Sequence, residues 1–261
     1  MIELLQAVLL GLLQGLTEFI PVSSSAHLII AEEGVDANFG GLAYDVVLHL
    51  GTLTALLIYF RAELITLGRA VFHPGASRKL LGYLVIATLP AAIVGFFASD
   101  LIESALRSLW VIVVMLVVGA LVMFLVDRRR GSRELGELRL RDAVIIGFSQ
   151  ALALIPGTSR AGATLVAGSW LGFNNAEAAR FSFLMAVPIL LGANLRVLSS
   201  SDVLSELSAE LPYYILGFLV AAASAYFVIR FLLDYLSTHK LAVFAWYRLI
   251  LAGALVLILV I

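Results

Sequence analysis

The feature that most constrains this chain is a series of apolar segments long enough to cross a membrane. A bilayer core needs about 20 consecutive apolar residues, and six stretches come close to that length: 42–60, 80–98, 109–127, 180–198, 213–233 and 242–261. Of the 261 residues, 62% are hydrophobic and 13% are charged, about half the charged fraction of a soluble domain. The sequence therefore predicts an all-α polytopic membrane protein with one membrane domain, residues 1–261, and no soluble domain.

Two further apolar regions, 2–31 and 142–172, are each interrupted by a short stretch rich in Pro, Ser and Gly. Irregular backbone at membrane depth is tolerated only where it is buried in protein or lines a cavity. Each region therefore predicts a re-entrant helical hairpin, two short helices joined by a bend, rather than a seventh or eighth span.

The charges of the connecting segments predict how these elements are oriented. Segments 61–79, 128–141 and 234–241 carry Arg61, Arg69, Arg78, Lys79, Arg128, Arg129, Arg130, Arg133, Arg139, Arg141 and Lys240. Segments 32–41, 99–108 and 199–212 carry Arg107 but also Glu32, Glu33, Asp36, Asp100, Glu103, Asp202, Glu206 and Glu210. Because basic loops stay in the cytoplasm, the first set is expected inside.

This orientation makes the two halves of the chain an inverted repeat. The first hairpin enters from outside, the second enters from inside, and three spans follow each. We expect repeat 1 at about 1–127, a cytoplasmic linker at 128–141 and repeat 2 at about 142–261. In proteins of this construction the functional site lies near the midplane, where the broken elements meet.

The first hairpin carries polar side chains at its bend. Gln14 and Glu18 are four residues apart and share a helix face, and Pro21 ends that helix. The next helix begins with three hydroxyls and an imidazole: Ser23, Ser24, Ser25 and His27. An ionised group at the bilayer centre costs about 2.5–3.5 kcal/mol on insertion scales, so intramembrane acids and imidazoles are candidates for function.

The second hairpin repeats this construction with a guanidinium in place of the acid. Both hairpins have a Gln, then Ile-Pro, then a Ser three residues beyond the proline, which pairs Ser24 with Ser159. The candidate site residues here are Gly157, Thr158, Ser159, Arg160 and, one turn later, Thr164. A helix N-terminus attracts anions, Gly157 permits close backbone approach, and the fork of Arg160 matches phosphate oxygens. Two such bends facing each other predict a binding site for a phosphorylated ligand.

Each of these residues also has a structural reading. An intramembrane serine can hydrogen-bond to the preceding turn, Glu18 can be a structural cap, His27 can be a packing residue, and Arg160 can simply neutralise Glu18. The functional reading rests on their occurrence together in two related bends. Asp45 and His49, four apart at the outer start of a span, either support this site or lie at the membrane interface. Arg248, beside Trp246 and Tyr247, is typical of an interfacial anchor, although it could also reach inward.

The two motifs resemble the signatures of a known family. Gln14–His27 and Pro156–Thr164, with flanking stretches along the whole chain, are similar to the undecaprenyl-pyrophosphate phosphatases of the bacitracin-resistance type. The resemblance implies an interdigitated inverted repeat and removal of the terminal phosphate from undecaprenyl pyrophosphate. That reaction recycles the lipid carrier for peptidoglycan synthesis at the outer face of the cytoplasmic membrane, with a divalent cation, Mg or Ca.

The same resemblance implies the roles of individual residues. The essential acid falls on Glu18, the serine pair on Ser23 and Ser24, the histidine on His27 and the arginine on Arg160. Gln14 stands where many members have a second Glu, which leaves one carboxylate fewer for the cation. Glu18 is thus the expected metal ligand, with Gln14 as the weaker second candidate, and the chain has no Cys to act as a thiolate ligand.

Our hypothesis for the reaction has Ser24 as nucleophile, His27 as general base and Glu18 either binding the cation or orienting His27. The alternative chemistry has His27 itself as nucleophile. The alternative function is a lipid-phosphate flippase or transporter, because inverted repeats with broken helices are typical of transporters. The expected partners are the lipid substrate and the bilayer, with no nucleic acid. The sequence leaves open whether the protein is a homodimer.

Overall fold

The structure is a computed structural model that describes residues 2–34, 41–128, 131–199 and 211–260. Six helices in this part of the chain are long and apolar enough to cross a membrane. They are α3 (Gly41–Tyr59), α5 (Ala76–Leu106), α6 (Leu109–Val126), α9 (Asn175–Leu198), α11 (Leu211–Thr238) and α12 (Ala242–Val260). The six predicted spans are therefore confirmed. The loop charges Asp36, Arg129, Arg130, Asp202, Glu206 and Glu210 lie outside the described residues.

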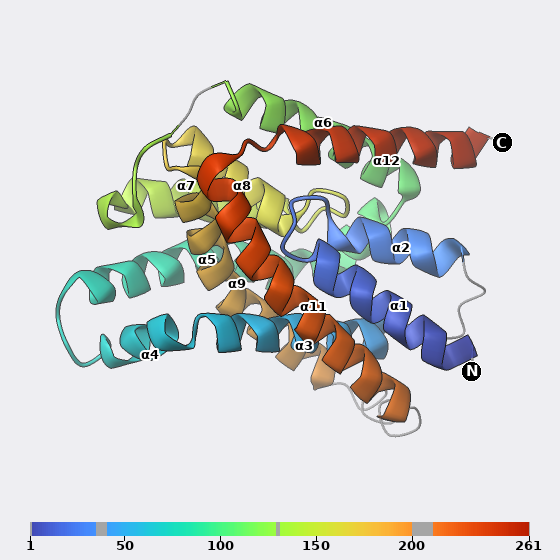
Figure 1. Ribbon diagram of the computed structural model, residues 1–261, viewed down its shortest axis with the longest axis horizontal. Coiled ribbons are helices and arrows are strands. Elements are labelled where there is room, and N and C mark those ends of the chain that lie inside the picture. The colour runs from blue at the N-terminus through green and yellow to red at the C-terminus, as the bar shows by residue number, and fades with distance from the viewer. Residues whose placement is uncertain (1, 35–40, 129–130, 200–210, 261) are drawn as a thin grey trace.

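Two pairs of short helices form the predicted hairpins. The first is α1 (Ile2–Thr17) with α2 (Ser24–Gly34), and the second is α7 (Leu140–Leu152) with α8 (Arg160–Trp170). The two hairpins enter from opposite ends of the molecule, and their bends lie near its centre (Figure 1). The end that carries α4 (Arg61–Arg69) lies opposite the two chain termini (Figure 1), and a short helix, η1 (Leu135–Glu137), precedes α7 in the chain.

A serine with a left-handed backbone begins the second helix of each hairpin. Ser23 has φ 76° and Ser159 has φ 70°, and each hydroxyl accepts a hydrogen bond from an amide N–H three residues later. Such an N-cap satisfies one of the free N–H groups of the first turn. The structurally equivalent serines are thus Ser23 and Ser159, not Ser24 and Ser159 as the proline spacing suggested. Ser24 is instead equivalent to Arg160, since each opens its helix.

The two halves interdigitate rather than lie side by side. Helix α5 of the first half packs on α7 of the second hairpin, and α11 of the second half packs on α1 and α3. The pairs α3 with α9, α5 with α9, α6 with α12 and α6 with α8 also join the two halves. Each hairpin is therefore held in place partly by the other half, which brings the two bends to a common position.

Small residues allow these close helix contacts. A Cβ added to Gly11 of α1 would lie 2.8 Å from the carbonyl oxygen of Gly217 on α11, and one on Gly147 of α7 would lie 2.7 Å from that of Ala87 on α5. Gly11 and Gly147 precede Gln14 and Gln150 by the same three residues. Small residues at such crossings let the helix backbones approach each other in a bilayer.

The repeat predicts that these two glycines are equally sensitive. Gly11→Ala and Gly147→Ala should each lower the free energy of unfolding by about 1–3 kcal/mol, because the new methyl group meets backbone that must move away. Gly192→Ala is the control, since no atom lies within 4 Å of a Cβ at that position. Thermal unfolding in detergent measures all three. Equal midpoints for the three variants would contradict the packing described here.

Candidate active site

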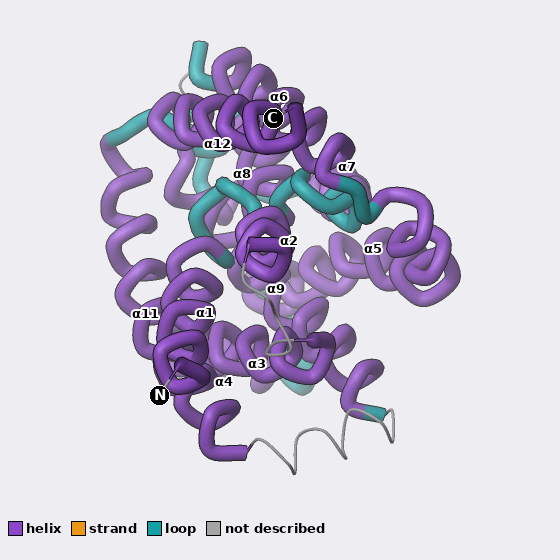
Figure 2. Tube along the Cα trace, turned by 90° about the vertical axis from the view of Figure 1, so that its right-hand side faces the viewer, coloured by secondary structure: helices purple, strands orange, loops and turns teal. Residues whose placement is uncertain are grey.

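The bends of the two hairpins meet through a buried ion pair. Nη2 of Arg160 lies 2.6 Å from Oε1 of Glu18, and the two side chains are 14% and 5% exposed. The tip loops of the two hairpins lie near the centre of the molecule when it is viewed from the end with both termini (Figure 2). The structure therefore brings the predicted acid and the predicted guanidinium together.

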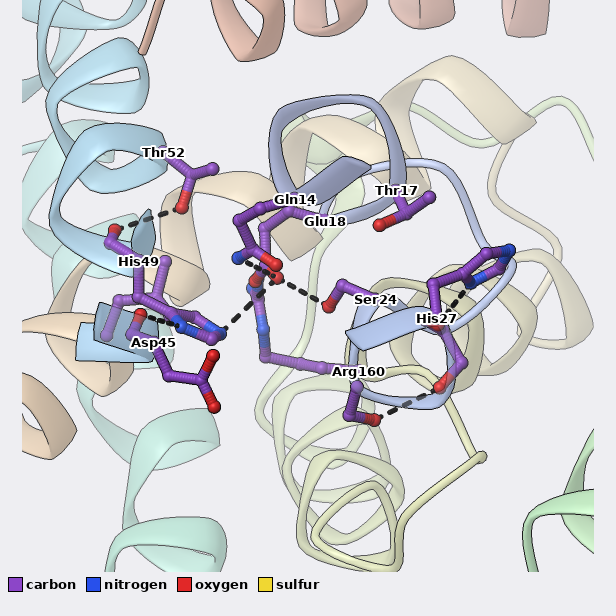
Figure 3. A network of polar contacts seen from close by, with 12 residues as sticks. Gln14, Thr17, Glu18, Ser24, His27, Asp45, His49, Thr52 and Arg160 are labelled. Carbon is purple, nitrogen blue, oxygen red and sulfur yellow. Dashed lines mark hydrogen bonds and ion pairs between the residues drawn. The ribbon is translucent and has the colours of Figure 1, made fainter. Parts of the chain in front are cut away.

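Glu18 is the centre of a larger polar cluster. Its Oε2 accepts hydrogen bonds from Nε2 of Gln14 at 3.0 Å and from Oγ of Ser24 at 2.7 Å. Nε2 of His49, from the first long span, lies 3.7 Å from the same oxygen. Figure 3 shows these side chains converging on Glu18 from three elements. His49 therefore faces the cluster, which favours the reading that it supports the site.

Three polar atoms in or beside this cluster are buried and make no hydrogen bond within the described residues. They are Nη1 of Arg160, Oε1 of Gln14 and Oγ1 of Thr158. A buried polar atom without a partner costs about 1–3 kcal/mol, and more when it is charged. A ligand that brings acceptors to Arg160 would remove that cost. The guanidinium thus offers a buried, unused donor that suits an anion.

The hydrogen bonds of His27 do not involve Ser24. Its Nδ1 lies 2.7 Å from the carbonyl oxygen of Ser23 and its Nε2 lies 2.7 Å from the hydroxyl of Tyr247. A carbonyl can only accept, so Nδ1 carries the proton and Nε2 accepts from the tyrosine. In Figure 3 the imidazole points away from Glu18. His27 is thus fixed by its own turn and by α12, whereas the hydroxyl of Ser24 is held by Glu18.

The other predicted site residues have mainly structural contacts. Ser23 is 1% exposed, and its hydroxyl lies 3.2 Å from that of Ser25. Ser159 caps α8. Gly157 has φ 88°, and a Cβ there would meet the backbone of Ile112 on α6 at 2.8 Å. The hydroxyl of Thr164 bonds to the carbonyl of Arg160 and to the hydroxyl of Ser182, buried beneath the bend.

Arg248 is not an interfacial anchor. Its side chain is 0% exposed, and it donates to the carbonyl oxygens of Pro21, Gly157 and Thr158 in the two bends. It also donates to Met115 and Leu116 of α6. Its position beside two aromatic residues suggested the membrane interface, and no local pattern in the sequence indicates that it reaches the bends. The same is true of Tyr247.

The donor set for a divalent cation is small. The hydrogen-bonded groups at Glu18 offer its own carboxylate and one unpaired amide oxygen, Oε1 of Gln14, and Figure 3 shows the side chain of Asp45 in the same network. The described residues contain no group of three or more His, Cys, Asp or Glu side chains suited to a metal ion. Mg²⁺ is commonly bound by one or two protein oxygens together with substrate phosphates and water. The residues present fit a cation that arrives with a phosphorylated ligand.

Comparison with known proteins gives a consistent result along the chain. The profile of the family described as bacitracin resistance protein BacA matches residues 7–254. An undecaprenyl-diphosphatase of Rubrobacter xylanophilus is 44% identical, with 97% of each chain covered. Proteins of the same name from Elusimicrobium minutum and Gemmatimonas aurantiaca are each 42% identical, covering 97% and 94% of this chain and 96% and 94% of their own.

The ion pair between Glu18 and Arg160 leads to a prediction about stability. Glu18→Gln should lower the free energy of unfolding by about 3–5 kcal/mol, because it leaves the buried Arg160 charge uncompensated. The double variant Glu18→Gln with Arg160→Leu should recover much of that loss, since neither charge remains. Thermal unfolding of the two single variants and the double variant in detergent measures the coupling. Strictly additive effects would show that the pair is not coupled.

Proposed function

The chain belongs to the bacitracin resistance protein BacA family, and we propose that the buried cluster at Glu18 is the site where it acts as a phosphatase. The protein is a multi-pass membrane enzyme, an undecaprenyl-diphosphatase, which hydrolyses undecaprenyl pyrophosphate to undecaprenyl phosphate and inorganic phosphate. This activity supplies the lipid carrier for peptidoglycan synthesis and accounts for the link of the family to bacitracin resistance.

One observation carries the assignment of the site. Ser24 and Arg160, the equivalent first residues of α2 and α8, both contact the carboxylate of Glu18. A nucleophilic hydroxyl, an acceptor for its proton and a donor for phosphate oxygens are thus within one cluster. Catalysis of phosphoryl transfer consists mostly of such positioning and charge neutralisation. All three residues come from one chain, so the proposal does not require a homodimer.

In the first half of the reaction, Arg160 binds the terminal phosphate through its unused Nη1. Oγ of Ser24 attacks the terminal phosphorus while Oε2 of Glu18, 2.7 Å away, takes the hydroxyl proton. The bond between this phosphorus and the bridging oxygen breaks. Undecaprenyl phosphate leaves with that oxygen, and a phosphoserine remains at Ser24. The guanidinium and the N–H groups at the start of both second helices stabilise the charge that develops.

In the second half, a water molecule attacks the phosphorus of the phosphoserine. The Oγ–P bond breaks, Glu18 returns its proton to Ser24, and phosphate leaves with the two protons of the water. This assignment moves the role of base from His27 to Glu18, because Nε2 of His27 is already bound to Tyr247. The alternative chemistry keeps His27 as nucleophile.

We place the enzyme in the cytoplasmic membrane with the site opening to the outer face. Basic residues support this orientation: Arg61, Arg69, Arg78, Lys79, Arg133, Arg139 and Arg141 occupy the end of the molecule from which the second hairpin enters. The positive-inside rule assigns that end to the cytoplasm. The first hairpin, with Glu18 and Ser24, then enters from outside.

We further propose that a divalent cation, Mg or Ca, binds with the substrate. Glu18 and Oε1 of Gln14 would hold it together with the diphosphate oxygens. When bound, such a cation neutralises phosphate charge and thereby makes the phosphorus easier to attack.

The nucleophile is tested with detergent-purified protein and a polyprenyl pyrophosphate. Ser24→Ala and Arg160→Ala should each lose about a hundredfold or more in phosphate release while remaining folded. Rapid acid quench followed by mass mapping should locate the phosphoryl group on Ser24. Recovery of the label on His27 would establish the alternative chemistry, and near-normal turnover of Arg160→Ala would remove its assigned role.

The cation is tested in the same assay with a chelator. Phosphate release should fall to the background rate in the chelator and return when Mg²⁺ or Ca²⁺ is added in excess. Full activity in the presence of the chelator would contradict the proposed cation. Thermal unfolding of the protein without substrate should change little on chelation, because most of the expected ligands belong to the substrate.

A further inference from the structure

We infer that Arg248 is a positioning residue for the reaction, because it holds the bends of both hairpins at a fixed separation. This inference rests on the proposed function for its kinetic part. Arg248 lies in α12, far along the chain from both bends, and its guanidinium is completely buried between them. It has no part in the chemistry described above, which uses Arg160.

All five N–H groups of the Arg248 guanidinium have an acceptor. Nε donates to Leu116 at 3.1 Å, and Nη2 donates to Met115 at 2.7 Å and to Gly157 at 3.0 Å. Nη1 donates to Pro21 at 3.3 Å and to Thr158 at 3.1 Å. Every acceptor is a backbone carbonyl. The guanidinium therefore has no donor left for a phosphate, and its five bonds join α6, α12 and the two bends.

The carbonyl groups that accept from Arg248 belong to residues close in the chain to those that form the site. Pro21 and Gly157 are equivalent in the two repeats, since each precedes its N-cap serine by two residues. The carbonyl of Pro21 lies midway between Glu18 and Ser24 along the chain, and that of Thr158 lies two residues before Arg160. A movement of either bend relative to Arg248 would therefore change the geometry around Glu18.

The guanidinium also packs closely against α6. A Cβ on Gly119 of α6 would lie 2.6 Å from Cζ of Arg248. Gly119→Ala therefore displaces the guanidinium without changing Arg248 itself. Gly253→Ala on α12 is a matched control, because nothing lies within 4 Å of a Cβ there. Arg230→Lys, at an exposed arginine of α11, is the control for Arg248→Lys.

The kinetic test compares these variants in phosphate release from a polyprenyl pyrophosphate by detergent-purified protein. Lys retains the charge but has three N–H donors at one atom, so it cannot reach five carbonyls. Arg248→Lys and Gly119→Ala should each lose up to about a hundredfold in kcat with little change in KM, as expected for misplaced catalytic groups. The two control variants should keep wild-type values. A rise in KM at unchanged kcat would assign Arg248 to substrate binding, and unchanged kcat would overturn the inference.

A distance measurement separates positioning from loss of the fold. The chain has no Cys, so spin labels can be placed at Leu16→Cys and Leu152→Cys. These exposed positions, 45% and 62% accessible, are equivalent residues near the two bends. Arg248→Lys should broaden or shift the distance distribution between the labels, and Arg230→Lys should not. Unchanged distances in a slow variant would overturn the inference.

The outcome of these two tests can be distinguished from a failure of the proposed function. If the wild-type protein released no phosphate, the proposed function would fail, whereas the label distances would still test whether Arg248 fixes the bends. If Arg248→Lys did not fold, both measurements would be made on Gly119→Ala instead.

Discussion

Backbone groups at membrane depth have no water to bind, and this constraint governs the whole structure. A helix satisfies its own peptide groups, but a bend cannot. This protein has two bends in the interior of the membrane domain. Their carbonyls at Pro21, Gly157 and Thr158 receive hydrogen bonds from one buried guanidinium, that of Arg248. A third element, α12, thus supplies hydrogen-bond donors to both interrupted helices.

The inverted repeat then explains why acid, hydroxyl and guanidinium meet. The two hairpins enter from opposite ends, and each second helix begins at the centre with an N-cap serine. Equivalent positions have different side chains: Ser24 corresponds to Arg160, and Glu18 corresponds to Leu154. The repeat supplies a symmetric frame, and differences at a few positions divide the chemistry between its halves. A symmetric pair of carboxylates would repel, whereas Glu18 and Arg160 attract.

Whether a feature could be predicted from the sequence depends on how far apart along the chain the interacting residues are. Spans and hairpins depend on local hydropathy and on Pro21 and Pro156, so their existence was clear from the sequence. The contact between Gln14 and Glu18 follows from helical spacing. The prediction that Ser24 is equivalent to Ser159 was wrong because the proline is offset by one residue between the two repeats. The equivalent positions follow the N-cap serines, Ser23 and Ser159, instead. Tyr247, the partner of Nε2 of His27, is 220 residues away along the chain, and the partners of Arg248 in the bends are at least 90 residues away. No spacing rule reports such contacts.

The two arginines at the bends, Arg160 and Arg248, show why residue type alone does not assign a role. Arg160 donates to Glu18 through Nη2, while its Nη1 is buried without an acceptor within the described residues. Arg248 has an acceptor for each of its five N–H groups. Only a guanidinium with unused donors gains by binding an anion, because a saturated one must first break existing bonds. The hydrogen bonds that each arginine already makes therefore distinguish the two: Arg160 keeps a donor free for an anion, as the proposed function requires, and Arg248 is committed to the backbone of the bends.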